Sequence, residues 1–379
     1  MTVAKIRLGP SGGSLVPIKI LFTGYAPVHF VCFLPYYERL KSLPDVEVTL
    51  SGGLRSKTED GWVYDAEALY RPFGVPSAEI AEADALHDSH FNLEFAGHTK
   101  RLVPTSAETR IQIFHGVSYR NKSIRRENLK WDYFFIVGPY MRRRFAEAEL
   151  LPDGDPRAIN VGFPKTDRLL DGSLDAAKLR ADYGLPDDRP ILLYAPTGAK
   201  ENSLETMGEA AIEALKNAGK YTVLVKPHDH PRNRQVDWFD RLSHLEDRHC
   251  HVMREPDVVK LLFIADLLIS DASSVANEYT LLDRPILFLD TPALIEHARE
   301  AEESMLDLDT WGRKGGTIVL SPADLTAAVD KCLANPNEKS EIRHAISQDL
   351  FFNPGEAADA AMAWIESEVI NLRACTADL

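Results

Sequence analysis

The chain has 379 residues and a formal net charge of −14, and 45% of its residues are hydrophobic. It is too long for a single hydrophobic core, so we expect two domains. The acidic balance argues against nucleic-acid binding, and no apolar run approaches the ~20 residues that a membrane-spanning helix needs.

The four cysteines are scattered, and no pair has the spacing of metal ligands or of a redox motif. Such a pattern is typical of reduced thiols in a cytosolic protein. The N-terminus lacks the charged-then-apolar layout of a signal peptide, so we interpret residues 1–15 as a loose leader. No Asp-x-Asp pair follows a predicted strand as a metal anchor would require. We therefore expect a cytoplasmic protein with neither a bound metal nor a cofactor.

Apolar strands and helical segments alternate along the chain in two runs. The first run predicts strands at 18–22, 46–50, 111–114, 133–137 and 158–161, with helices over 30–40 and 140–149. Residues 55–88 are mixed, with weak helices and a short strand near Ala85. The second run predicts strands at 190–194, 221–225, 251–253, 267–269, 286–289 and 317–320. Its helices are predicted over 204–218, 236–245, 275–282, 322–334 and 356–372.

This alternation predicts an α/β protein with two doubly wound parallel-sheet (Rossmann-like) domains facing across a cleft. We place an N-terminal, acceptor-side domain at 1–170 and a C-terminal, nucleotide-donor domain at 171–350. Residues 351–379 are expected to form a C-terminal helix that packs back toward the N-terminal domain. The charged connection at 169–182 is the expected hinge.

One segment is basic in this otherwise acidic chain. Residues 100–149 contain eleven Lys and Arg against five Asp and Glu. This surplus is consistent with an ordinary solvated face. It is also consistent with a patch for a phosphate-bearing acceptor or for an anionic membrane surface.

Polar residues follow four predicted strands, where the crevice of a doubly wound sheet binds ligands. They are His115, Thr197, His228 and the pair Ser273-Ser274. The serine pair follows a buried strand and precedes a helix, whose free N–H groups and dipole favour an anion. The alternative is that one serine only caps the helix.

Six short motifs occur in an order that resembles the CDP-glycerol glycerophosphotransferase family of teichoic-acid primases and polymerases. They are His115-Gly116, the turn 162–167, Tyr194-Ala195-Pro196-Thr197, Lys226-x-His228, Asp271-Ala272-Ser273-Ser274 with Glu278, and Pro285-Ile286-Leu287-Phe288. The resemblance implies the two-Rossmann-domain glycosyltransferase-B (GT-B) fold. It also implies that an acceptor hydroxyl attacks the β-phosphorus of CDP-glycerol and that CMP leaves, in the synthesis of a teichoic-acid or capsule-like polymer.

The resemblance implies two catalytic histidines. His115 is the expected base, and its titration range near neutrality suits that role. His228 is the expected partner that stabilises the departing phosphate. His230 is a second candidate for the same position, and we prefer His228 because it is closer to the strand. The alternative for His115 is a structural bond to a backbone carbonyl.

The expected donor-binding residues are Thr197, Lys226, Ser273, Ser274 and Glu278. Glu278 has the right chemistry to accept bonds from both ribose hydroxyls, although it is also consistent with an exposed helix glutamate. Arg120 and Lys122 are candidate acceptor-side residues.

Several positions differ from the family pattern, and these differences leave the donor open between CDP-glycerol, another CDP-alcohol and a nucleotide sugar. They are Ala272, Gly198-Ala199-Lys200, the segment 117–122 and Asn353-Pro354-Gly355-Glu356. A UDP-sugar glycosyltransferase or a UDP-N-acetylglucosamine 2-epimerase relative is therefore an alternative, as is a nucleotide-binding protein without catalysis. The acceptor is expected to be lipid-linked or phosphate-bearing, with peripheral membrane contact.

Overall fold

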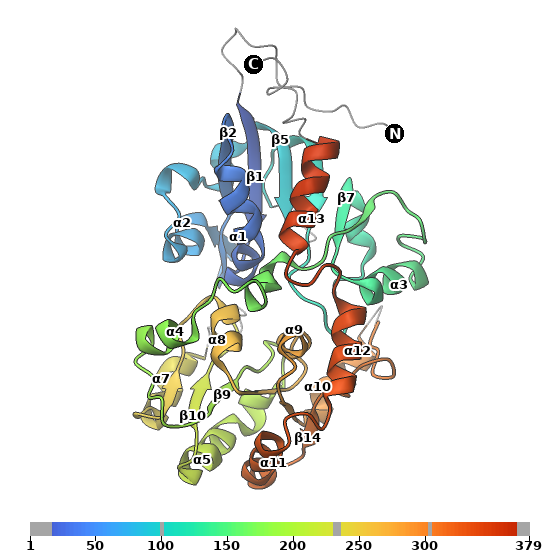
Figure 1. Cartoon of the computed structure of the whole chain (residues 1–379). Coiled ribbons are helices and arrows are strands. Elements are labelled where there is room, and N and C mark those ends of the chain that lie inside the picture. The colour runs from blue at the N-terminus through green and yellow to red at the C-terminus, as the bar shows by residue number, and fades with distance from the viewer. Residues whose placement is uncertain (1–16, 99–101, 230–235, 302–304, 370–379) are drawn as a thin grey trace. The chain divides into compact units, whose positions relative to one another are not determined.

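The computed structural model describes residues 17–98, 102–229, 236–301 and 305–369 (Figure 1). These residues form two compact units. Unit 1 contains the described residues up to His115, residues 125–167 and those from Phe352 onward. Unit 2 contains residues 116–124 and 168–351. The chain therefore enters unit 2 briefly after His115 and returns to unit 1 at Arg125.

Unit 1 is built on a six-stranded parallel sheet with the strand order β2-β1-β5-β6-β7-β8. The order reverses between β1 and β5, which makes their carboxyl ends the topological switch point, where doubly wound folds bind ligands. The strands are β1 (Ile18–Gly24), β2 (Val46–Gly52), β5 (His90–Ala96), β6 (Ser106–Gln112), β7 (Tyr133–Ile136) and β8 (Ala158–Asn160).

Helices and one hairpin complete unit 1. Its helices are α1 (Pro27–Lys41), α2 (Ala66–Tyr70), α3 (Pro139–Glu147) and α13 (Ala357–Trp364). The antiparallel hairpin of β3 (Leu54–Thr58) and β4 (Gly61–Asp65) follows β2. Figure 1 shows α13, drawn in red, beside α1. Asp167 fixes the start of α13, because its carboxylate accepts the N–H groups of Ala357 and Ala358 at 3.1 and 2.7 Å.

Unit 2 contains a second six-stranded parallel sheet, with the order β11-β10-β9-β12-β13-β14. Its switch point lies between β9 and β12. The strands are β9 (Ile191–Tyr194), β10 (Thr222–Val225), β11 (Cys250–Val252), β12 (Leu267–Ser270), β13 (Ile286–Leu289) and β14 (Thr317–Val319). β9, β10, β12 and β13 are buried along their whole length, as expected for parallel strands covered on both faces.

Eight α-helices are described in unit 2. They are α4 (Ala176–Asp182), α5 (Glu209–Ala218), α7 (Trp238–Leu242), α8 (Val258–Ile264), α9 (Val275–Tyr279), α10 (Pro292–Glu300), α11 (Pro322–Ala334) and α12 (Ser340–Leu350). Single turns extend or connect these elements in both units. The 3₁₀ turns are Arg71–Phe73, Ser77–Glu79, Ala83–Leu86, Arg126–Lys130, Pro164–Leu169, Ser243–Leu245 and Thr280–Leu282, and the π turns are Leu204–Gly208 and Ile365–Val369.

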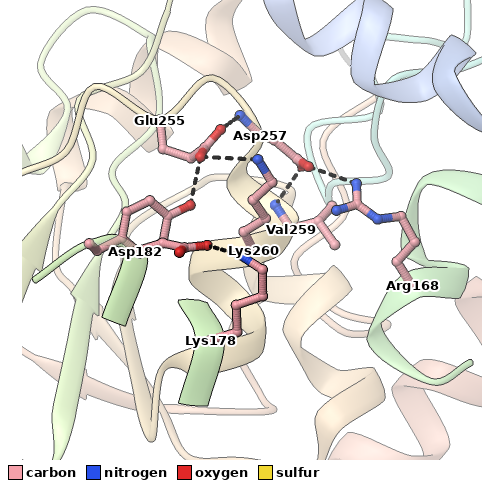
Figure 2. A network of polar contacts seen from close by, with 8 residues as sticks. Arg168, Lys178, Asp182, Glu255, Asp257, Val259 and Lys260 are labelled. Carbon is pink, nitrogen blue, oxygen red and sulfur yellow. Dashed lines mark hydrogen bonds and ion pairs between the residues drawn. The ribbon is translucent and has the colours of Figure 1, made fainter. Parts of the chain in front are cut away.

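In unit 2, a polar network connects the segment from Arg168 to Tyr183 with α8 and the residues just before that helix (Figure 2). The Asp257 carboxylate caps α8 through the Val259 N–H at 3.2 Å and binds Arg168 Nη1 at 2.6 Å. Glu255 accepts the Tyr183 hydroxyl at 2.6 Å and Lys260 Nζ at 3.2 Å. Ion pairs and hydrogen bonds therefore hold the first residues of the segment 168–351 to the rest of unit 2.

The predicted α/β fold with two doubly wound parallel sheets is confirmed, although some elements differ from the prediction. Residues near Ala85 form a 3₁₀ turn, so the strand predicted there is wrong. The prediction missed β5, the β3–β4 hairpin, α10 and α12. The expected hinge contains α4. Part of the predicted C-terminal helix, residues 370–372, lies outside the described residues.

The described residues can be compared with the expectations about cysteines, membrane-spanning helices and metal sites. Cys32, Cys250 and Cys332 are buried free thiols, whereas Cys375 lies outside the described residues. A search of the described helices finds none long and apolar enough to cross a membrane. Over the same part of the chain, no group of three or more His, Cys, Asp or Glu side chains is arranged to hold a metal ion.

Candidate functional site

The donor-side candidates of unit 2 gather at one edge of its sheet. Thr197 follows β9, Lys226 follows β10, and the turn 271–274 follows β12. These three strands are neighbours in the order β10-β9-β12 and run parallel. Their carboxyl ends, and the polar residues that follow them, therefore meet at the switch point of the sheet.

Asp271 organises this edge. Its carboxylate accepts the Thr197 N–H at 2.8 Å, the Ser203 N–H at 2.9 Å and the Ser203 hydroxyl at 2.8 Å. It also accepts the N–H of the next residue, Ala272. The side chain is fully buried, and these donors satisfy its oxygens in the place of water. The sequence analysis treated Asp271 only as part of a turn and missed this role.

The serine pair follows Asp271 in the same turn, and Glu278 lies in the helix α9 that comes next. Ser273 is buried, and Ser274 directly precedes α9 but makes no side-chain bond to the helix N-terminus. Ser274 thus occupies the N-cap position without making the side-chain bond that the capping alternative predicts. Glu278 is completely buried, so its interpretation as an exposed helix glutamate is wrong. Because α9 has only five residues, side chains rather than a long helix dipole must supply most of any anion binding.

The segment 116–124, which directly follows His115, belongs to unit 2 and is held there by backbone contacts. Gly116 packs on Ser274, and a Cβ at position 116 would lie 2.6 Å from the Ser274 Oγ. Asn277 Nδ2 donates to the Val117 carbonyl at 2.9 Å. The Asp307 N–H donates to the Tyr119 carbonyl at 2.8 Å. The residue after the candidate base is thus fixed against the candidate phosphate-binding serine.

Arg120 is placed by the same segment. Its Nη2 donates to the Thr197 Oγ1 at 2.9 Å, so Arg120 lies beside one of the donor-side candidates within unit 2. Burial lowers the pKa of Arg120, while Tyr119 and Asp271 oppose that effect. Lys122 is exposed in the same segment and also belongs to unit 2.

Lys226 and the second histidine follow β10. Lys226 is buried, and its Nζ contacts the two carboxylate oxygens of Asp229 at 3.0 and 3.2 Å. This ion pair offsets much of the charge that Lys226 would offer to a phosphate. His228 is exposed. His230 lies outside the described residues, so the choice between the two histidines stays open.

His115 lies in unit 1, after β6, and its ring is oriented by the backbone. Its Nδ1 is 3.1 Å from the Gly97 carbonyl oxygen, and a carbonyl only accepts, so Nδ1 carries the hydrogen. In the neutral ring, Nε2 is then the basic nitrogen. The pKa of His115 is lowered, chiefly because the surrounding protein desolvates the charged ring, with Lys165 adding repulsion and the Gly97 bond opposing it.

The sequence analysis missed two histidines near this site, His29 beside His115 and His98 beside His29. The His29 ring lies 4.9 Å from the His115 ring and 6.0 Å from the His98 ring. His29 Nδ1 accepts the Tyr25 N–H at 3.0 Å. Burial, followed by repulsion from His115, His98 and Arg55, holds the pKa of His29 well below its usual range. His29 and His98 follow β1 and β5. The rule that polar residues after strand ends mark a site, which located His115, therefore applies to them as well. However, β5 itself was not predicted.

A search of protein-family models matches residues 98–364 to CDP-Glycerol:Poly(glycerophosphate) glycerophosphotransferase. Among curated relatives, a teichoic acid poly(glycerol phosphate) polymerase of Staphylococcus epidermidis is 29% identical over 178 residues, covering 44% of this chain and 24% of the relative. Two relatives come from Bacillus spizizenii. A teichoic acid glycerol-phosphate primase is 31% identical over 138 residues, covering 34% of this chain and 33% of the relative. A teichoic acid ribitol-phosphate primase is 26% identical over 300 residues, covering 71% and 72%. The chain thus matches only part of the length of the polymerases.

Solved structures share the fold. The wall teichoic acid polymerase TagF has a TM-score of 0.67 at 18% identity, covering 92% of this chain and 88% of that chain. TagF with CDPG has a TM-score of 0.63 at 20% identity, with the same coverage. The UDP-GlcNAc 2-epimerase from Neisseria meningitidis bound to UDP-GlcNAc has a TM-score of 0.52 at 13% identity, covering 92% of this chain and 100% of that chain. At these identities the likeness shows the GT-B type of fold alone.

Proposed function

The chain belongs to the CDP-glycerol:poly(glycerophosphate) glycerophosphotransferase family, and from this we propose that it transfers glycerol phosphate from CDP-glycerol to a hydroxyl acceptor. CMP is the second product. A related alditol phosphate is an alternative cargo, because the relatives include both glycerol-phosphate and ribitol-phosphate enzymes. The biological setting that we propose is the synthesis of teichoic acid or a capsule-like polymer.

The orientation of His115 is the observation that carries the proposal. Its Nδ1–H donates to the Gly97 carbonyl, which leaves Nε2 as the proton acceptor. The lowered pKa favours the unprotonated form of this nitrogen, which is the form that can act as a base. In the proposed step, the acceptor oxygen forms a bond to the β-phosphorus while its proton moves to Nε2. The bond from that phosphorus to the CMP oxygen breaks, and CMP leaves.

The donor is proposed to bind at the switch-point edge of unit 2. Ser273, Ser274 and Thr197 offer hydroxyl groups at this edge, and Arg120 adds a guanidinium beside Thr197. We propose that these groups hold the diphosphate, with His228 stabilising the charge that develops on the leaving phosphate. The buried Glu278 would accept bonds from the ribose hydroxyls. Gly116, which directly follows His115 in the chain, packs on Ser274 at this edge.

CMP release tests this function directly. The protein is incubated with CDP-glycerol and a hydroxyl acceptor, and CMP is quantified. We expect His115→Gln to reduce the rate by about 10²–10⁴-fold, the usual contribution of a general base. His87→Gln is the matched control, because His87 is an exposed histidine of the same unit. An unchanged rate in His115→Gln would reject the assignment of His115.

The UDP-sugar alternative shares the fold with the epimerase neighbours. It is tested by measuring the thermal stability of the protein with CDP, CMP, UDP and UMP. A ligand at 100 times its Kd stabilises the protein by about 2.7 kcal/mol, so a base preference is measurable. Stronger stabilisation by UDP than by CDP would favour the alternative. Binding of CDP-glycerol without CMP release across a panel of acceptors would favour a nucleotide-binding protein without catalysis.

We also infer a cytoplasmic location at the inner face of a membrane, with a lipid-linked or phosphate-bearing acceptor. The three buried free thiols and the basic segment support this inference. Part of that basic charge is internally paired, since Arg144 forms an ion pair with Glu147, and Arg142 donates a hydrogen bond to the Asn160 side chain. Arg125, Arg126 and Arg143 remain exposed. Co-sedimentation with anionic vesicles tests the inference, and no vesicle binding at low salt would reject it.

A further inference from the structure

One face of the β3–β4 hairpin in unit 1 combines cations with aromatic rings. In the antiparallel register, Arg55 is opposite Tyr64 and Lys57 is opposite Trp62. Residues directly opposite share a face, and residues two apart on a strand share it as well. Arg55, Lys57, Trp62 and Tyr64 therefore lie on one face of the hairpin, which carries two positive charges and no carboxylate.

Arg55 is held between two rings. Its guanidinium lies 4.3 Å from the centre of the Tyr25 ring and 4.6 Å from the centre of the Trp62 ring. Stacking uses the faces of a guanidinium, whereas its N–H groups donate in its plane. The two rings therefore orient the donors without competing for them. Planar, oriented guanidinium groups suit phosphate recognition.

Trp62 is unusually exposed for a large aromatic residue. Half of its surface is accessible, whereas most large apolar side chains of the unit are buried. Trp62 precedes Val63, which is exposed on the opposite face of the hairpin. A tryptophan exposed beside a cation offers an apolar ring face next to a positive charge. This combination fits a ligand that has both an anionic group and a less polar face.

The hairpin face connects to the histidines of unit 1 through direct contacts. Tyr25, which contacts Arg55, lies with its ring 4.5 Å from the His29 ring. His29 lies 4.9 Å from His115. Tyr25 and His29 follow β1, and His98 follows β5, so this row of groups crosses the switch point of the unit 1 sheet. The position is the unit 1 counterpart of the donor edge in unit 2.

We propose that this row, from Trp62 and Arg55 to Tyr25, binds the acceptor through a phosphate group that the acceptor carries. Arg55, with Lys57 nearby, holds the phosphate, Trp62 covers the adjoining carbon atoms, and the hydroxyl extends toward His115. This inference rests on the proposed transfer reaction. Tyr25, Arg55, Lys57 and Trp62 all precede residue 98, where the family match begins.

Two acceptors that differ only by a phosphate test the site. Initial rates of CMP release are measured with glycerol and with glycerol 3-phosphate at saturating CDP-glycerol. We expect the wild type to prefer glycerol 3-phosphate and Arg55→Ala to raise its KM by about tenfold or more, because a charge-assisted bond is lost. The KM for glycerol and the KM for CDP-glycerol should change little. Equal KM values for the phosphorylated acceptor in wild type and Arg55→Ala would overturn the proposal.

Matched variants separate the site from general effects on folding. Arg71→Ala removes an exposed arginine of the same unit, and Val63→Ala removes an exposed apolar residue of the same hairpin. Neither should change the acceptor KM. Trp62→Ala should raise it, and Trp62→Phe should restore part of the affinity. If Val63→Ala and Trp62→Ala have equal effects, the hairpin has only a structural role and the proposal is wrong.

Direct binding keeps the proposal testable if the transfer reaction itself fails. Glycerol 3-phosphate and glycerol are titrated into the wild type and Arg55→Ala by calorimetry. Phosphate-dependent binding that Arg55→Ala abolishes supports the site, even if no CMP is ever released. No phosphate preference in the wild type contradicts it. The last experiment measures sedimentation with phosphatidylglycerol vesicles. If Trp62→Ala loses vesicle binding but keeps the wild-type KM for the acceptor, this face binds a membrane and the proposal is wrong.

Discussion

Gly116 packs so closely on Ser274 that a Cβ at position 116 would lie 2.6 Å from the Ser274 Oγ and 2.9 Å from its Cβ. Real Cβ atoms essentially never approach other atoms so closely, so one of the two segments must shift if position 116 gains a side chain. Gly116 follows the candidate base, and Ser274 belongs to the candidate phosphate site. Both residues belong to unit 2, so the contact fixes the residue after the candidate base against the candidate phosphate site.

Gly116→Ala is expected to lower stability by about 1–3 kcal/mol, the usual cost of overpacking, and to raise the KM for CDP-glycerol. Urea unfolding and CMP-release kinetics measure the two effects. The double variant Gly116→Ala/Ser274→Gly removes both clashing atoms and serves as the matched test. Its stability should exceed the value obtained by adding the two single effects. Simple additivity would show that the contact does not carry strain.

The pH dependence of the reaction follows from the state of His115. A base acts only when unprotonated, so the rate should fall as pH drops through its pKa. Because desolvation by the surrounding protein and repulsion from Lys165 lower that pKa, the acidic limb should lie below about 6.5, the ordinary histidine value. Lys165→Gln removes a repulsion and should move the limb to higher pH. The position of the limb is measured from kcat/KM against pH. An unchanged position in Lys165→Gln would contradict the repulsion between Lys165 and His115.

His29 should make unit 1 sensitive to acid. Its pKa in the folded protein is well below its unfolded value, so the unfolded chain binds more protons below about pH 6.5. Stability is therefore lost as pH falls from that value, by at most about 1.4 kcal/mol per pH unit for this one group. His29→Asn retains an acceptor for the Tyr25 N–H and should reduce the slope. Hydrogen exchange of β1 amides at several pH values measures it, with His87→Gln as the exposed control.

Most of the fold could be predicted because its strands are short apolar runs between helical segments. The strand β13, for example, has the bounds predicted from Ile286 to Leu289. The strand β5 was missed because Asn92 and Glu94 interrupt its apolar pattern. Glu94 is buried there, and Arg110, its partner across the β5–β6 register, lies 3.3 Å away. A sequence pattern does not contain that pairing.

The candidate site, like the fold, could be predicted where it depends on local sequence and not where it depends on contacts between distant residues. The strand-end rule locates His115, Thr197 and Ser273, because it depends only on local sequence. The placement of Arg120 on Thr197 depends on a contact between residues 77 positions apart. The bonds of Asp271 to Ser203 span 68 positions. Such contacts arise from packing between segments far apart in the chain, and a local sequence pattern does not contain them.

Two ion pairs in Figure 2 offer a comparison of buried and exposed charge. Asp257 is nearly buried in its pair with Arg168, whereas Lys178 and Asp182 are both exposed. Arg168→Ala leaves a buried carboxylate without its cation and should cost about 1–3 kcal/mol in unfolding free energy. Lys178→Ala should cost about 0.5 kcal/mol or less. Equal losses, measured by urea unfolding, would show that burial does not set the difference.

Asp271 provides the sharpest test of how unit 2 is organised. Asp271→Asn replaces one acceptor oxygen by an NH₂ group, which then faces N–H donors of Thr197 or Ser203 in a buried environment. A buried donor left without an acceptor costs about 1–3 kcal/mol, so we expect unit 2 to lose at least that much stability. Binding of CDP should weaken as well, because Thr197 and the serine turn lose their common support. Calorimetric titration with CDP and urea unfolding measure both effects. Asp188→Asn, at an exposed carboxylate of the same unit, should change neither. Wild-type stability and CDP affinity in Asp271→Asn would mean that the loops after β9 and β12 hold their positions without this carboxylate.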